Sequence, residues 1–121
     1  MSEIQKLFVF EQSRDTLIIE PQGDSVGFRA TDVDKEIQTL TQLIRLDDVS
    51  NVVFDLKQAN YFGSSMIGMI IALAEEMRNH GGKAVMCDVS PQMKQMLEIM
   101  KVGLVLEQFP NRRKALKAVS K

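Results

Sequence analysis

The sequence predicts an α/β fold, a mixed and mostly parallel β-sheet with an N-terminal hairpin and about four helices. Short runs of β-branched and aromatic residues alternate along the chain with segments whose apolar residues recur every three or four positions. The first two apolar runs follow one another with no helical segment between them, which indicates the hairpin. Because 121 residues suit one domain, we expect residues 1–121 to form a single domain.

The elements alternate between strand and helix after the hairpin. The expected strands span residues 7–10, 16–20, 51–56, 83–88 and 104–106. The expected helices span residues 31–45, 64–79, 91 to about 103, and 111–119. The polar run Glu-Gln-Ser-Arg-Asp at 11–15 is typical of a turn between two antiparallel strands.

The helices are predicted from apolar stripes and from signals at their ends. The stripe of the first helix consists of Val33, Ile37, Leu40 and Ile44. Thr31 or Asp32 is expected to cap its start. The second helix is apolar almost all round and ends at His80-Gly81-Gly82. A serine and a proline, Ser90 and Pro91, predict the start of the third helix. Its expected apolar face carries Met93, Met96, Leu97 and Met100.

Composition excludes several classes of function. The 15 basic and 16 acidic residues leave a net charge of −1, which argues against a nucleic-acid partner. One Cys and one His exclude an internal disulfide framework and argue against a metal site. The sequence has neither a run of 18 apolar residues nor a basic-then-apolar start, so we expect a cytoplasmic protein without direct membrane insertion. The near-zero charge hides an acidic first half and a basic, Met-rich second half.

The sequence offers no plausible catalytic set. It lacks a Gly-rich phosphate loop ending in Gly-Lys-Ser/Thr, a dinucleotide fingerprint and the Gly-x-Ser-x-Gly elbow of a hydrolase. We expect His80 to lie in a surface turn and Cys87 to be a small core residue of the fourth strand. We therefore expect no enzymatic activity, no catalytic residue and no cofactor.

The stretch from Asn51 to Val102 resembles the STAS-domain family of anti-sigma factor antagonists. That family has an apolar strand ending in Asp-Leu, an Asp-Ser-Ser-Gly turn that opens a helix, a Gly-Gly pair, another strand and a Ser-Pro helix. The matching residues are Phe54-Asp55-Leu56, Phe62, Ser64-Ser65, Gly68, Gly81-Gly82, Val89-Ser90-Pro91, Leu97 and Gly103. Together with the hairpin and the first helix, the resemblance covers nearly the whole chain and implies a STAS-like fold.

The resemblance implies a switchable protein-binding module. In the family, the antagonist binds an anti-sigma factor that is also a serine kinase, and phosphorylation of the first serine of the turn disables the antagonist. That position is Ser64 here, and Ser65 is the second candidate. Two residues depart from the pattern, since Gly63 replaces the acid and Met66 replaces the glycine. The alternative is an unphosphorylated scaffold or a small subunit of a larger signalling or transport assembly.

Two further features bear on the partner surface. Met66 and Met69 flank Ser64 on the first turns of the helix, so we expect them to form an apolar, partner-facing patch with Gly63, Ser64 and Ser65. The basic residues of the final helix are interpreted as a solvated face; they are Arg112, Arg113, Lys114 and Lys117. We expect the free protein to be a monomer or a weak dimer.

Overall fold

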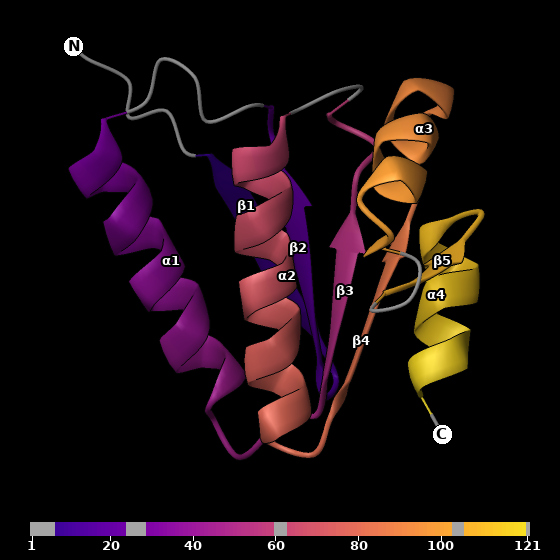
Figure 1. The fold of residues 1–121 in the computed structure, drawn as a ribbon. Helices are drawn as coiled ribbons and strands as arrows, with labels where there is room; N and C mark the ends of the chain where they lie inside the picture. Colours follow the sequence, from indigo (N-terminus) through magenta and orange to yellow (C-terminus); the bar gives the residue numbers. More distant parts are fainter. Residues whose placement is uncertain (1–6, 24–28, 60–62, 103–105, 121) are drawn as a thin grey trace, which may run out of the picture.

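The computed structural model describes residues 7–23, 29–59, 63–102 and 106–120. Its strands are β1 (Phe8–Ser13), β2 (Thr16–Pro21), β3 (Asn51–Asp55), β4 (Lys83–Cys87) and β5 (Glu107–Phe109). Its helices are α1 (Ala30–Ile44), α2 (Ser64–Asn79), α3 (Pro91–Ile99) and α4 (Arg112–Val119). Figure 1 shows the helices packed around one central sheet.

The five strands form one sheet in the order β1-β2-β3-β4-β5. The β1–β2 pair is antiparallel, and the three remaining pairs are parallel. The predicted fold class, a mixed and mostly parallel sheet with an N-terminal hairpin, is therefore confirmed. The carboxyl ends of β2, β3 and β4 lie along one edge of the sheet, and α2 starts at this edge (Figure 1).

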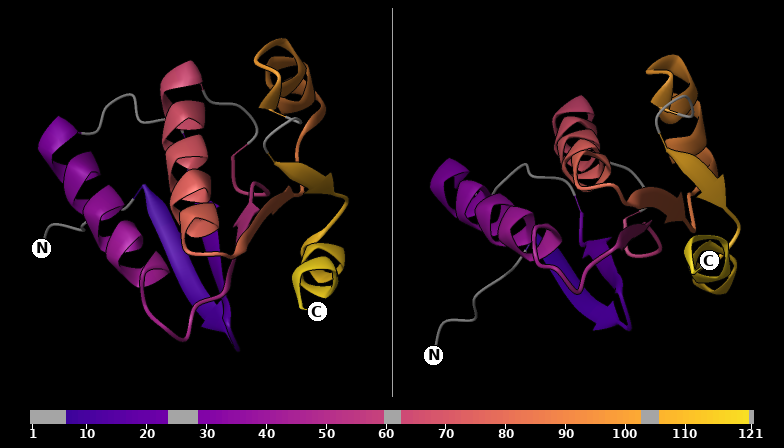
Figure 2. Two further views of the ribbon diagram at one scale, coloured as in Figure 1. Left: turned by 60° about the horizontal axis from the view of Figure 1, so that its bottom comes forward. Right: turned by 90° about the horizontal axis from the view of Figure 1, so that it is seen from below.

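The sheet is covered unequally on its two faces. Helices α1, α2 and α3 pack on one face and form the larger core, whereas α4 packs alone on the other (Figure 2). Alternation along the strands explains the division, since Val52 and Phe54 point into the larger core and Val53 points toward α4. The α4 cluster is small; its buried members are Ile18, Val53, Val85, Cys87, Ala115 and Val119.

Most predicted boundaries agree with the structure, but two strands and the third helix differ. Helix α3 ends at Ile99 rather than near 103, so Met100 is its C-cap and is exposed rather than part of the apolar face. The turn of the hairpin is only Arg14-Asp15, because the polar residues before it still pair with β2 as an exposed edge strand. Arg14 adopts a φ of 55°, as a residue in such a tight turn can. The strand expected at 104–106 falls mostly outside the described residues, as does Phe62, and the strand that pairs with β4 is Glu107–Phe109.

The helix starts are only partly as expected. Ser90 caps α3 by accepting a hydrogen bond from the Met93 amide at 3.1 Å, which confirms the signal of Ser90 and Pro91. The expectation for α1 is wrong: its N-cap is Arg29, which makes no side-chain capping bond, and Thr31 lies inside the helix. Within α1, Glu36 accepts the backbone amides of Leu7 and Phe8 at 3.0 and 2.9 Å and so ties the helix to the edge strand.

Two of the glycines between the start of α2 and the end of β4, Gly68 and Gly82, should respond in opposite ways to replacement by alanine. A Cβ on Gly82 would lie 2.1 Å from the backbone oxygen of Ser50, whereas one on Gly68 would meet open space. We expect Gly82→Ala to lower the free energy of unfolding by about 1–3 kcal/mol, because a backbone atom must move. Gly68→Ala, within α2, should raise it by about 0.5–1 kcal/mol. Urea denaturation of both variants measures the two effects, and equal shifts would contradict the Gly82 contact.

Candidate functional site

The start of α2 presents two exposed serines at the carboxyl edge of the sheet. Gly63 is the N-cap, with an extended backbone (φ −81°, ψ −176°), and Ser64 is the first helical residue. Ser64 and Ser65 are both exposed. We call residues 63–65 the serine turn. The first serine, Ser64, follows the N-cap residue, so its hydroxyl is not the group that caps the helix.

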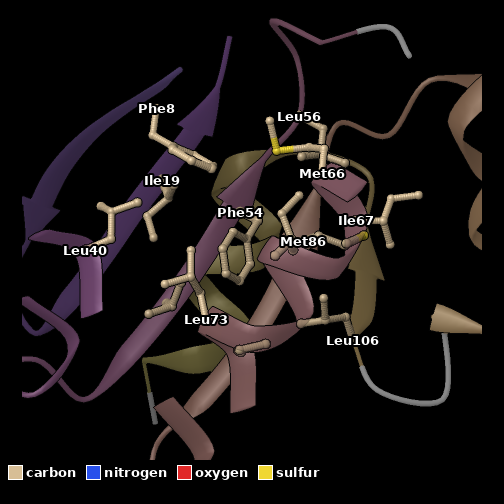
Figure 3. Packing of buried hydrophobic residues seen from close by; sticks show 14 of the residues in the cluster. Phe8, Ile19, Leu40, Phe54, Leu56, Met66, Ile67, Leu73, Met86 and Leu106 are labelled. Atoms are coloured by element: carbon tan, nitrogen blue, oxygen red, sulfur yellow. The ribbon is translucent and has the colours of Figure 1, made fainter. Parts of the chain in front are cut away.

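Met66 does not lie on the surface. Its side chain is fully buried in the larger core, among the side chains labelled in Figure 3. Its expected place in an exposed patch is therefore wrong, because the helix rotation that exposes Ser64 and Ser65 turns the next residue toward the sheet. Met69 is half-buried and packs against the same core. The structure thus places the serine turn on the surface and anchors it through Met66.

The surface around the serine turn consists of small residues, two of them hydroxyl-bearing, rather than of methionines. Along the outward side of α2, Gly68 and Ala72 are exposed like the two serines. Of the five residues expected to face a partner, Ser64 and Ser65 are exposed, and Gly63 and Met69 are partly exposed. A phosphate or a carboxylate placed here would lie at the positive end of the α2 dipole.

A second constellation, which the sequence did not reveal, lies under the start of α4. The Arg112 guanidinium donates through Nε to Asp55 at 2.8 Å, through one terminal nitrogen to Glu11 at 2.6 Å and through the other to Glu20 at 2.5 Å. Asp55 is fully buried, whereas the Arg112 side chain is 24% exposed. The expectation that Arg112 belongs to a solvated face is wrong; Arg113, Lys114 and Lys117 are exposed as expected.

The carboxylates that Arg112 bridges come from three neighbouring strands. Asp55 ends β3, Glu20 lies in β2 and Glu11 lies in β1. Burial by itself lowers the pKa of Arg112, but its hydrogen bonds to the three carboxylates outweigh burial and raise the pKa above its ordinary value. The guanidinium therefore stays charged and pairs with one carboxylate from each of the three strands, while the Nζ of Lys57 lies 3.9 Å from Asp55.

Asp55, Cys87 and Asp88 approach one another at the end of β3 and β4. Their oxygen and sulfur atoms lie within 4.8 Å of one another. Burial, and next the charges of Asp55 and Asp88, raise the pKa of the Cys87 thiol above its usual range. Burial and a hydrogen bond with Asp55 likewise raise the pKa of Asp88. A protonated thiol is a poor metal ligand, and Asp55 already accepts from Arg112, so this group belongs to the ion-pair network.

His80 lies where the sequence predicts it. His80 is exposed at the C-cap of α2, where its ring nitrogen Nδ1 lies 3.0 Å from the Glu76 carbonyl oxygen, as expected of a surface turn. In the part of the chain that the structure describes, no helix combines the length and the apolar character that crossing a membrane requires.

Comparison with protein families decides the classification. The family model of the STAS domain matches residues 8–115, from the first residue of β1 into α4. The chain belongs to the STAS domain family. The match includes both the serine turn and Arg112, so both constellations lie within the STAS domain.

Solved STAS structures share this fold at low sequence identity. SpoIIAA, an anti-sigma factor antagonist solved in its unphosphorylated form, has a TM-score of 0.72 at 15% identity; the alignment covers 92% of this chain and 95% of that one. The same protein, a Bacillus cell fate determinant, has also been solved in its phosphorylated form, with a TM-score of 0.68 at 18% identity, covering 93% of this chain and 98% of that one.

Two other neighbours show the range of proteins with this fold. An anti-sigma-factor antagonist (STAS) domain protein from Planctomyces limnophilus has a TM-score of 0.76 at 20% identity, covering 94% of this chain and 98% of that one. The murine anion transporter Slc26a9 has a TM-score of 0.67 at 11% identity, covering 90% of this chain but 18% of the transporter. This fold thus occurs both over nearly the whole of a small protein and as a small part of an anion transporter.

Proposed function

We propose that this STAS domain is a regulatory protein-binding module of the anti-sigma factor antagonist type, that it is not an enzyme, and that phosphorylation of Ser64 switches it. The observation that carries the proposal is the exposed position of Ser64 as the first residue of a rigidly anchored helix. The likeness to SpoIIAA, solved in unphosphorylated and phosphorylated forms, supports it. The partner is an anti-sigma factor that is also a serine protein kinase, acting in the cytoplasm.

A phosphate on Ser64 would act through charge rather than through unfolding. It adds about −1.5 to −2 charges at neutral pH, and the amides at a helix start and the helix dipole favour that charge. Because Met66 keeps the first turn of α2 packed in the core, the serine turn has a stable platform on which to carry the phosphate. A partner that contacts Gly63, Ser64 and Ser65, with part of Met69, would then meet a charged and bulkier surface.

Kinase treatment tests the modification directly. The protein is incubated with Mg²⁺-ATP and each serine kinase of the anti-sigma type from the same genome, and its intact mass is followed. We expect the wild type and Ser65→Ala to gain one phosphate and Ser64→Ala to gain none. Phosphate on Ser64→Ala, or none on the wild type with every kinase, would contradict the proposed switch.

A second candidate keeps the fold and omits the switch. The match to a small part of Slc26a9 favours an unphosphorylated scaffold or a small subunit of a larger signalling or transport assembly. The departures at Gly63 and Met66 also favour it, because they alter the residues on both sides of the serine pair. In that case the chain would co-purify with a stable assembly, and Ser64→Asp would leave the association unchanged.

A further inference from the structure

Helix α4 is attached to the second face of the sheet by a small apolar contact. Its buried residues are Ala115 and Val119, and Leu116 packs beside them partly buried. These small side chains cover Val53, Val85 and Cys87 on β3 and β4. Since hydrophobic stabilisation scales with the apolar area removed from water, this contact is weak compared with the larger core on the other face.

Arg112 supplies the rest of the attachment. The helix lies over β3, β4 and β5, and Arg112 at its first turn extends the attachment to Glu20 on β2 and Glu11 on β1. Its third bond, to Asp55, satisfies a carboxylate that is fully buried. One side chain therefore joins α4 to β1 and β2, beyond the three strands over which the helix mainly packs.

Releasing α4 would leave the rest of the fold intact. The helix contributes no strand to the sheet, so the five-stranded ladder and the core beneath α1, α2 and α3 do not depend on its position. Release would let water hydrate the buried Asp55 carboxylate and the mostly buried Glu20 carboxylate, and it would uncover Val53, Val85 and the Cys87 thiol; Glu11 is already 61% exposed.

We infer that Arg112 is an electrostatic latch and that α4 opens from the second sheet face as a unit while the five-stranded sheet stays folded. The opened state presents an apolar strip on β2, β3 and β4 beside the acidic row of Glu11, Glu20 and Asp55. Such an opening has a lower free energy than global unfolding and exposes less surface. This inference does not depend on the proposed switch at Ser64.

The chain's one cysteine, Cys87, reports the opening, because it is fully buried beneath α4. The rate of Cys87 modification by a thiol reagent is measured in rising urea below the unfolding transition. Amide exchange in α2 over the same range reports global unfolding. We expect Cys87 to react faster than global unfolding allows. We also expect its modification rate to rise less steeply with urea than the amide exchange rate of α2. If Cys87 modification and α2 amide exchange gave the same opening free energy and the same dependence on urea, the latch would be overturned.

Two arginines of the same helical turn provide a matched comparison. Arg112→Met should accelerate Cys87 modification about a hundredfold and keep its shallow urea slope, because the buried Asp55 loses its ion pair at 2.8 Å and keeps only Lys57 at 3.9 Å. Arg113→Met, at an exposed position, should leave the rate unchanged. Equal rates in the two variants would overturn the inference. If Arg112→Met does not fold, Arg112→Lys, which cannot bridge three carboxylates, should show a smaller acceleration in the same direction.

Discussion

Replacing Met66 with Ala should lower the free energy of unfolding by about 3 kcal/mol, within the range of about 2–5 kcal/mol for truncating a buried methionine. The side chain is fully buried between α2 and the sheet, and its removal leaves a cavity beneath the serine turn. Urea denaturation followed by far-UV circular dichroism measures the loss.

Met100 provides the control for this prediction. It lies at the C-cap of α3 with 36% of its surface exposed, so Met100→Ala should cost less than about 1 kcal/mol. If Met66→Ala cost no more than Met100→Ala, the methionine would not be the anchor of α2.

Replacing Arg112 with Met should also lower the free energy of unfolding by about 3 kcal/mol, because the buried Asp55 carboxylate loses its ion pair at 2.8 Å and keeps only the half-exposed Lys57 at 3.9 Å. Arg113→Met should change it by less than about 0.5 kcal/mol. Chemical denaturation of the two variants under identical conditions gives the comparison, and equal losses would contradict the role of Arg112.

A double-mutant cycle separates the ion pair from the packing of the arginine stem. In an Asp55→Asn background, Arg112→Met should cost less than in the wild type, since a neutral amide is less costly to leave unpaired than a carboxylate. Additive costs would show that Arg112 acts through its apolar stem rather than through Asp55.

The order of the elements could be predicted because the signals are local. The alternation of strand runs and helical stripes locates α2 at residues 64–79, as observed, and Ser90-Pro91 marks the start of α3. The cap of α1 was harder to predict. Thr31 and Asp32 are residue types that favour the N-cap, but the helix starts earlier, and its N-cap is Arg29. The exact strand ends were also not predicted, because the polar residues at the end of β1 form backbone pairs with β2 just as apolar residues do.

The two constellations differ in how far the sequence could reveal them. Ser64 could be located from a short motif, but the burial of Met66 depends on how α2 is rotated against the sheet. Arg112 was missed because its partner Asp55 lies 57 positions earlier and Glu11 lies 101 positions earlier. No local spacing encodes such a contact, and in sequence Arg112 is one of several basic residues on a short helix. Only the sheet brings the three carboxylates together.

The most direct test of the proposed function compares partner binding by wild type, Ser64→Ala and Ser64→Asp. The partner is an anti-sigma factor kinase from the same genome, and affinity is measured by calorimetry. Ser13→Asp, an exposed position at the hairpin end of the sheet, opposite the carboxyl edge where α2 starts, controls for added charge. The account predicts that Ser64→Ala and Ser13→Asp bind like the wild type and that Ser64→Asp loses about 100-fold in affinity. Equal affinity of Ser64→Asp and the wild type would contradict it.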